Sequence, residues 1–249
     1  MSGVGGDEAF CGYKKYKSGY LNYYIQKYLN FHSTFNSSQR FLKVINTPFP
    51  QYIPWRHFND KDKNKFFDNE FIHGEQGEII EKLLTSSNME KPLQKIMYVF
   101  NKTWLVGDLL QGADKMSMAA SIEQRVPFVD PAILEYGMNL RPISLLWSEK
   151  ALLKNSFKDM IPDTITKRVK LGFQVPEIAW TQKYLKSQIV DVLTSAKFVN
   201  RDVFNKYEMN KLVEDYKLGN QVDLKKIWML FMLEIWFNIF VDQSNWREY

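Results

Sequence analysis

The first residues after Met1 combine glycines and acids in a pattern that suits phosphate chemistry. Residues 2–8 read Ser-Gly-Val-Gly-Gly-Asp-Glu. Glycine reaches backbone angles that residues with a Cβ avoid, so successive N–H groups can converge on one anion at a helix start. Asp7 and Glu8 would repel a phosphate unless a divalent cation lay between them, and Mg²⁺ is the usual bridge. The segment therefore indicates a loop that binds phosphate together with Mg²⁺.

The same residues also fit a purely structural role. Glycines make a tight turn, and acids favour the first turn of a helix because it is the positive end of the helix dipole. The string differs from a dinucleotide fingerprint because Glu8 stands where the third glycine is due, and it differs from a Walker loop because no Gly-Lys-Ser/Thr follows. Taken alone, the local residues slightly favour the structural role.

Three ordered blocks change that balance. Residues 2–16 resemble the pyrophosphate loop, SGxGxDExFGGY, of the glutamine-dependent asparagine synthetase family, and residues 109–130 resemble its central synthetase signature. A third block is similar to the family's closing signature, with Glu149, Lys150, Ile161, Pro162, Arg168, Lys170, Gly172, Phe173, Pro176 and Trp180. The connecting regions, especially residues 30–100, match only in length and helical character. The chain is thus identified as a member of this family.

The resemblance implies an ATP-dependent ligase that forms an amide. A carboxylate, from aspartate or another acid, is adenylated, pyrophosphate is held by the glycine loop, and glutamine-derived ammonia displaces AMP. The implied cofactors are ATP and Mg²⁺. Family members also carry an upstream SGGxDS loop that binds ATP and an N-terminal cysteine glutaminase domain, and neither is in this sequence. We therefore expect a truncated synthetase domain, completed by regions of the same chain or of a partner chain.

Residue roles follow from the same resemblance. Asp7 matches the acid that helps to hold Mg²⁺, and Lys150 matches the catalytic lysine that neutralises charge on the phosphates. Without the block around it, Lys150 would read as a solvated helix lysine. The positions that match pyrophosphate or ATP contacts are Ser2, Gly3, Gly5, Gly6, Lys150 and Lys170.

The acceptor end of the site is less clearly specified. Glu123 matches a catalytic glutamate of related β-lactam-forming members, and Asp114 is a second candidate for substrate contact. Glu123 and Arg125 equally fit a simple pair at a helix end. Val4 departs from the glutamate of asparagine-forming members, and a valine cannot take a proton or hold an ammonium. The alternatives are therefore a different amide, in a natural-product or surface-polysaccharide pathway, or a non-catalytic binding or scaffold remnant.

Composition favours a folded enzyme fragment in the cytoplasm. The chain has 249 residues, of which 45% are hydrophobic, and a formal net charge of +5. That excess suits an anionic ligand but does not indicate nucleic acid. The single cysteine, Cys11, stands where the family has glycine; it excludes an internal disulfide and a glutaminase nucleophile. The N-terminus lacks the basic and apolar pattern of a signal peptide.

Apolar residues recur mostly at helical spacing, so we expect a mainly α structure. Helices are predicted over residues 19–31, 36–46, 76–84 and 223–241. In the last of these, the apolar run from Ile227 to Val241 is shorter than the ~20 residues needed to cross a bilayer, and Glu234 and Asn238 interrupt it. A buried core helix is therefore expected, with no membrane contact.

The expected fold is the helical C-terminal portion of an α/β adenine-nucleotide synthetase domain of PP-loop type. The family's parallel sheet precedes the pyrophosphate loop, so the helices should dominate here. No linker or repeat divides the chain, and we expect a single domain over residues 1–249. Apolar surface that packs on the sheet in the family would be exposed, which favours a homo-oligomer.

Overall fold

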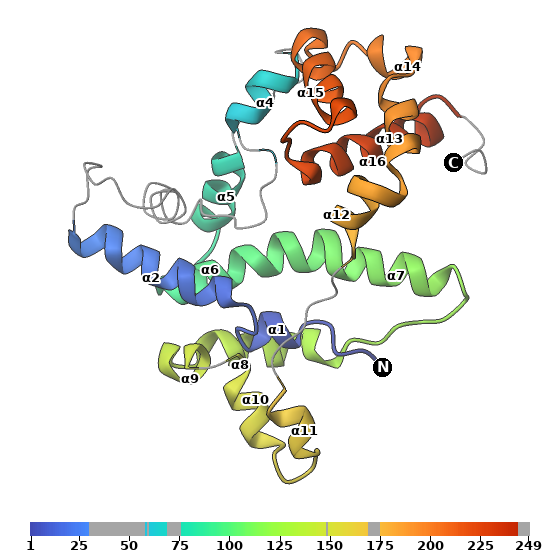
Figure 1. Ribbon diagram of the computed structural model, residues 1–249. Coiled ribbons are helices and arrows are strands. Elements are labelled where there is room, and N and C mark those ends of the chain that lie inside the picture. The colour runs from blue at the N-terminus through green and yellow to red at the C-terminus, as the bar shows by residue number, and fades with distance from the viewer. Residues whose placement is uncertain (30–57, 59, 69–75, 148, 169–174, 244–249) are drawn as a thin grey trace. The chain divides into compact units, whose positions relative to one another are not determined.

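The computed structural model describes residues 1–29, 58, 60–68, 76–147, 149–168 and 175–243. These residues are mainly helical (Figure 1), and the β pairing among them is an isolated antiparallel bridge between Phe67 and Phe204. The expectation of a mainly α structure is confirmed. The parallel sheet of a PP-loop domain stays a prediction, and the helix predicted over residues 36–46 lies outside the described residues.

The chain divides into two compact units. The first combines Met1–Pro54 with Gln76–Leu171, and the second combines Trp55–Glu75 with Gly172–Tyr249. The single domain expected over residues 1–249 stays a prediction.

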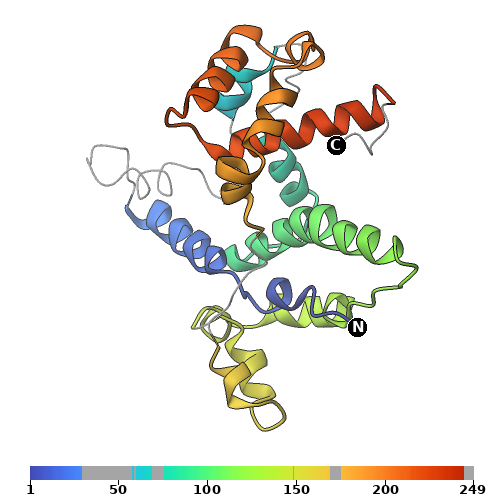
Figure 2. The ribbon, with the colours of Figure 1, turned by 45° about the vertical axis from the view of Figure 1, so that its right-hand side comes forward.

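The first unit is built from short helices around one long rod. In Figure 1 the rod is formed by α6, the π-helix η2 and α7, which follow one another without a break. The helices α10 and α11 lie at one end of the unit in Figure 1 and in Figure 2. The elements of this unit are α1 (Gly6–Ala9), α2 (Lys14–Leu29), α5 (Gln76–Thr85), α6 (Pro92–Phe100), η2 (Asn101–Leu110), α7 (Gln111–Met118), the 3₁₀ turn η3 (Pro127–Val129), α8 (Pro131–Asn139), α9 (Pro142–Leu146), α10 (Ala151–Ser156) and α11 (Asp163–Thr166).

Close packing fixes α1 in the middle of this unit. A Cβ on Gly137 of α8 would lie 2.2 Å from the carbonyl oxygen of Ala9, so only glycine lets the two backbones approach. In α2, which follows α1, the ring of Tyr16 lies 4.8 Å from the ring of Phe100 at the end of α6, with the two rings tilted by 41°. Asp130 caps α8 by accepting a hydrogen bond of 2.8 Å from the Ala132 amide, as Asp-Pro at a helix start predicts.

The second unit packs its helices around an apolar cluster. Its elements are α4 (Asp60–Phe66), α12 (Glu177–Ala179), the π-helical η4 (Trp180–Tyr184), α13 (Lys186–Leu193), α14 (Ala196–Val199), α15 (Lys206–Leu218) and α16 (Leu224–Phe240). The buried residues of the cluster are Phe66, Ile189, Leu193, Phe198, Phe204, Met209, Val213, Tyr216, Ile227, Leu230 and Phe231.

The last helix, α16, is a core helix, as its sequence predicts. Asp223 caps its start by accepting from the Lys225 amide. Glu234 and Asn238 are both buried, at 0% and 3% exposure, so the polar residues that interrupt the apolar run face inward. Among the described residues, none of the helices has the length and apolar character needed to span a bilayer.

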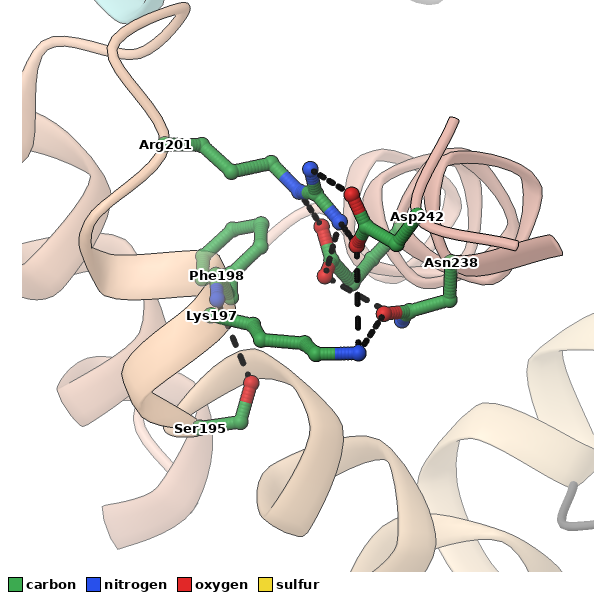
Figure 3. A network of polar contacts seen from close by, with 7 residues as sticks. Ser195, Lys197, Phe198, Arg201, Asn238 and Asp242 are labelled. Carbon is green, nitrogen blue, oxygen red and sulfur yellow. Dashed lines mark hydrogen bonds and ion pairs between the residues drawn. The ribbon is translucent and has the colours of Figure 1, made fainter. Parts of the chain in front are cut away.

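A buried ion pair explains why α16 tolerates an inward glutamate (Figure 3). Arg201 donates from Nη2 to Glu234 Oε1 at 2.9 Å and to Asp242 Oδ2 at 2.7 Å. Asn238 donates to the same glutamate at 3.2 Å, and Lys197 donates to Asn238 at 3.4 Å. The network joins the segment around α14 to the end of α16.

Replacing Arg201 should destabilise the second unit strongly. In Arg201→Met the Glu234 carboxylate stays buried without its cation, and removing one partner of a buried pair typically costs about 3 kcal/mol or more. Urea denaturation measures the change in the free energy of unfolding. The control is Lys206→Met, whose exposed pair with Asp202, at 3.6 Å, should matter by less than about 1 kcal/mol. Equal losses in the two variants would contradict this account of the network.

The contribution of Asp242 should depend on pH. Hydrogen bonds from Arg201 hold the pKa of the Asp242 carboxyl below its ordinary value of 3.8. A lowered pKa in the folded state stabilises the protein above the unfolded pKa, and this stabilisation is lost as the pH falls through the folded value. Asp242→Asn should therefore lower the free energy of unfolding equally at about pH 7 and pH 5, and the difference should shrink below about pH 4. Denaturation curves at each pH measure it, and a difference independent of pH would argue against a charged contribution.

Candidate functional site

The glycine loop turns where only glycine fits. Gly5 caps α1 with φ 92°, a left-handed angle that residues with a Cβ rarely adopt. A Cβ on Gly5 would also lie 2.5 Å from Cγ2 of Val129, and one on Gly6 would contact the ring of Phe128 at 3.5 Å. Asp7 and Glu8 then fall in the first turn of α1. The start of α1 thus has the form that both readings of the loop predict.

Backbone hydrogen bonds tie this loop to the central block of the sequence. The Ser2 amide donates to the carbonyl oxygen of Arg125 at 2.8 Å, and Ser2 Oγ accepts from the Val4 amide at 3.3 Å. The side of the loop that holds Gly5 faces Phe128 and Val129. The first two family-like blocks are therefore neighbours in space.

The third block reaches the same place through Lys150. Its Nζ lies 3.0 Å from Oδ1 of Asp7, and the two side chains are 27% and 20% exposed. Lys150 precedes α10 with φ 54°, a left-handed angle in a residue other than glycine. The ion pair brings two predicted site residues from distant parts of the sequence together.

The two acids of the loop have different surroundings. Glu8 is 1% exposed and accepts a hydrogen bond of 2.7 Å from the Tyr13 hydroxyl. Burial, together with the nearby Glu8 carboxylate, raises the pKa of Tyr13. Glu8 therefore supports the loop from inside, whereas Asp7 meets Lys150. Glu8 and Tyr13 were not among the predicted site residues, although both belong to the resembling loop motif.

Cys11 keeps a backbone angle typical of the glycine that the family has at this position. Its φ is 50°, a left-handed angle that glycine would adopt without strain, and its side chain is buried at 3% exposure. Burial raises the pKa of the Cys11 thiol, which keeps it neutral and unreactive.

The residues predicted for the acceptor end lie at the surface. Glu123 and Arg125 form an ion pair of 3.3 Å with side chains 72% and 76% exposed, as the simple pairing predicts. Asp114 is exposed on α7. Lys170 lies outside the described residues. The substrate role of Glu123 and Asp114 and the phosphate role of Lys170 stay predictions.

The donor set at the loop suits a metal that is completed by substrate. Among the described residues, no group of three or more His, Cys, Asp or Glu side chains forms a metal cage. Mg²⁺ is often bound by one or two carboxylates together with substrate phosphates and water. Asp7, a partly exposed carboxylate on the glycine loop, fits that kind of site.

A glycine loop that carries an acid and faces a lysine from a distant segment is typical of phosphate-binding sites. The chain belongs to the asparagine synthase family, whose model matches residues 1–238. The glutamine-hydrolysing asparagine synthetase 1 of Bacillus subtilis (strain 168) is 27% identical over 177 residues, 69% of this chain and 27% of that protein. Asparagine synthetase 3 of the same organism is 22% identical over 218 residues, 86% of this chain and 32% of that protein.

A fungal relative has a different name. Amidase chry2 of Gibberella zeae is 24% identical over 157 residues, 59% of this chain and 23% of that protein. The chain spans about a quarter to a third of the length of these curated relatives. No solved structure matches the chain significantly. The family is thus established from sequence.

Gly12 should be essential for the position of Asp7. A Cβ at Gly12 would lie 1.8 Å from Asp7 Oδ1 and 3.0 Å from its Cα, so Gly12→Ala must displace the carboxylate. We expect a loss of about 1–3 kcal/mol in the free energy of unfolding, as overpacking typically causes. The matched control is Gly107→Ala, where a Cβ meets nothing within 4 Å. Chemical denaturation compares the two, and equal stability would show that Asp7 moves without cost.

Proposed function

We propose that this chain supplies the pyrophosphate side of the active site of an ATP-dependent ligase that forms amides. Two observations support the proposal: the chain belongs to the asparagine synthase family, and Lys150 meets Asp7 of the glycine loop at 3.0 Å. The second observation carries it, because the structure brings together the acid and the lysine that the family resemblance assigns to one set of phosphates.

The residues divide the work on the phosphates. In the proposal the loop of Ser2, Gly3, Gly5 and Gly6 holds the pyrophosphate that leaves when the carboxylate is adenylated. The ammonium of Lys150 offsets the charge that builds up on the leaving group, an electrostatic role that is usually the largest single contribution to such a step. Lys170 would contact the same phosphates.

Asp7 would hold Mg²⁺, which when bound offsets charge on the phosphate oxygens. The Asp7 side chain is 20% exposed, although its Oδ1 atom is buried. Glu8 holds the first turn of α1 from beneath through the Tyr13 hydroxyl. In the proposal, Glu8 and Tyr13 therefore support the loop and Asp7 carries the metal.

The rest of the reaction needs regions beyond these residues. We propose that the family's ATP loop and its glutaminase domain, in the same or a partner chain, act with this site in the cytoplasm. The ATP loop would bind ATP, and the glutaminase domain would supply ammonia from glutamine. Met116, Met118 and Ile122, on and after α7, are 78%, 52% and 60% exposed, which supports packing against such a region or in a homo-oligomer.

The acceptor carboxylate is proposed to be aspartate or a different acid. Val4 is partly buried in the glycine loop, between Gly3 and Gly5, and offers no carboxylate to an amine. The relative chry2 is named an amidase rather than an asparagine synthetase. Turnover of the full-length enzyme on aspartate and on other carboxylates decides between the two; exclusive turnover of another acid would exclude asparagine synthesis.

Lys150→Ala should abolish most of the affinity for Mg²⁺-pyrophosphate. Hydrogen bonds to charged groups contribute about 1.5–3 kcal/mol, so we expect a loss of about tenfold to a hundredfold. Isothermal titration calorimetry on the 249-residue chain measures it. The control is Lys154→Ala, one turn along α10, where Nζ donates to the Arg168 carbonyl oxygen at 3.1 Å.

Equal affinity in the two variants would contradict the proposed role of Lys150. Absence of pyrophosphate binding in the unchanged chain would favour the non-catalytic binding or scaffold remnant. Binding that depends on Lys150 would exclude a purely structural role for this site.

A further inference from the structure

The two groups that the proposed function assigns to ligands contact each other. Lys150 Nζ lies 3.0 Å from the Oδ1 atom of Asp7. The inference that follows rests on the proposed function, in which Asp7 holds Mg²⁺ and Lys150 holds pyrophosphate. Each group is therefore engaged by the other when the ligands are absent.

Contacts with Gly12 hold Asp7 in place. Its backbone lies in α1, and its carbonyl oxygen accepts a hydrogen bond of 2.8 Å from the Gly12 amide. A Cβ on Gly12 would be 1.8 Å from Oδ1, so that oxygen lies against the Gly12 backbone on one side and the Lys150 ammonium on another. Lys150, by contrast, has four rotatable side-chain bonds and is partly exposed. Lys150 is the partner that can move.

A cation bound to the Asp7 carboxylate would lie close to the Lys150 ammonium, and like charges at such a distance repel each other. A pyrophosphate that draws Lys150 away would leave Asp7 open to the metal. A metal that takes Asp7 would likewise release Lys150 to the phosphates. Any such coupling acts equally in both directions, because binding free energies are linked.

We infer that the Asp7–Lys150 ion pair is an internal lock, in which Lys150 competes with a divalent cation for Asp7 until pyrophosphate draws the lysine away. The lock disfavours binding of either ligand alone and favours binding of both together. It would weaken the binding of free Mg²⁺ to the loop before the phosphates arrive.

A structural clamp is the competing account of the same contact. On that account the pair merely joins α1 to α10, and removing the lysine would disturb the loop and weaken the metal site. The lock predicts the opposite sign for metal binding measured alone. The sign of one affinity change therefore separates the two accounts.

The test is Mn²⁺ binding without pyrophosphate, followed by electron paramagnetic resonance on the unchanged chain and on Lys150→Met. Mn²⁺ is a spectroscopic substitute for Mg²⁺, and competition with Mg²⁺ checks that both use one site. Loss of a partly exposed ion pair worth up to about 1 kcal/mol should tighten Mn²⁺ binding by roughly twofold to fivefold. Lys154→Met, on the same helix, should leave it unchanged, and Asp7→Asn should abolish it.

Unchanged, weaker or undetectable Mn²⁺ binding in Lys150→Met would overturn the lock, and so would binding that survives Asp7→Asn. Far-UV circular dichroism on each variant checks that the helices are retained, and a Lys150→Arg variant, which keeps the cation, should bind Mn²⁺ no more tightly than the unchanged chain. The proposed function fails separately: if Lys150→Met tightens Mn²⁺ binding but the unchanged chain binds no Mg²⁺-pyrophosphate, the competition between Lys150 and the cation stands, whereas its release by pyrophosphate and the ligase role do not.

Discussion

The close approach of backbones around α1 is the constraint on which the candidate site depends. Three glycines lie against neighbouring groups at distances that a Cβ would not allow. Gly137 lies against the Ala9 carbonyl group, Gly5 against Val129, and Gly12 against the Asp7 carboxylate. At each position a Cβ would lie within 2.5 Å of a neighbouring atom. These approaches place the loop between α8 and the segment before it, and they aim Asp7 at Lys150. A short helix of only four residues, Gly6–Ala9, cannot hold such a position by its own hydrogen bonds. Tertiary packing therefore holds the loop.

The ion pairs Arg201–Glu234 and Asp7–Lys150 differ in burial between the two units. In the second unit, Glu234 is fully buried and Arg201 matches it with two hydrogen bonds, an arrangement that stabilises only while both partners are present. In the first unit, the side chains of Asp7 and Lys150 are partly exposed, and Lys150 Nζ lies 3.0 Å from Asp7 Oδ1. The greater burial of the Arg201–Glu234 pair thus suits a role in the fold, whereas the partly exposed Asp7–Lys150 pair is the one for which we propose a role in binding.

The sequence predicted those parts of the structure that local rules decide. The apolar spacing of α16 and the turn at Gly5 follow from residues a few positions apart. The meeting of Lys150 with Asp7 was accessible only through the family resemblance, because no local pattern links such distant residues. The pairing of Glu8 with Tyr13 was missed because two adjacent acids look alike until packing buries one of them. The division into two units had no linker or composition change to reveal it.

The most direct test of the central claim is an experimental structure of the chain with Mg²⁺ and pyrophosphate. The account predicts pyrophosphate oxygens within hydrogen-bonding distance of the Ser2–Gly6 loop and of Lys150 Nζ, with Mg²⁺ between the phosphates and the Asp7 carboxylate. Pyrophosphate bound elsewhere, with Lys150 still paired to Asp7, would contradict it.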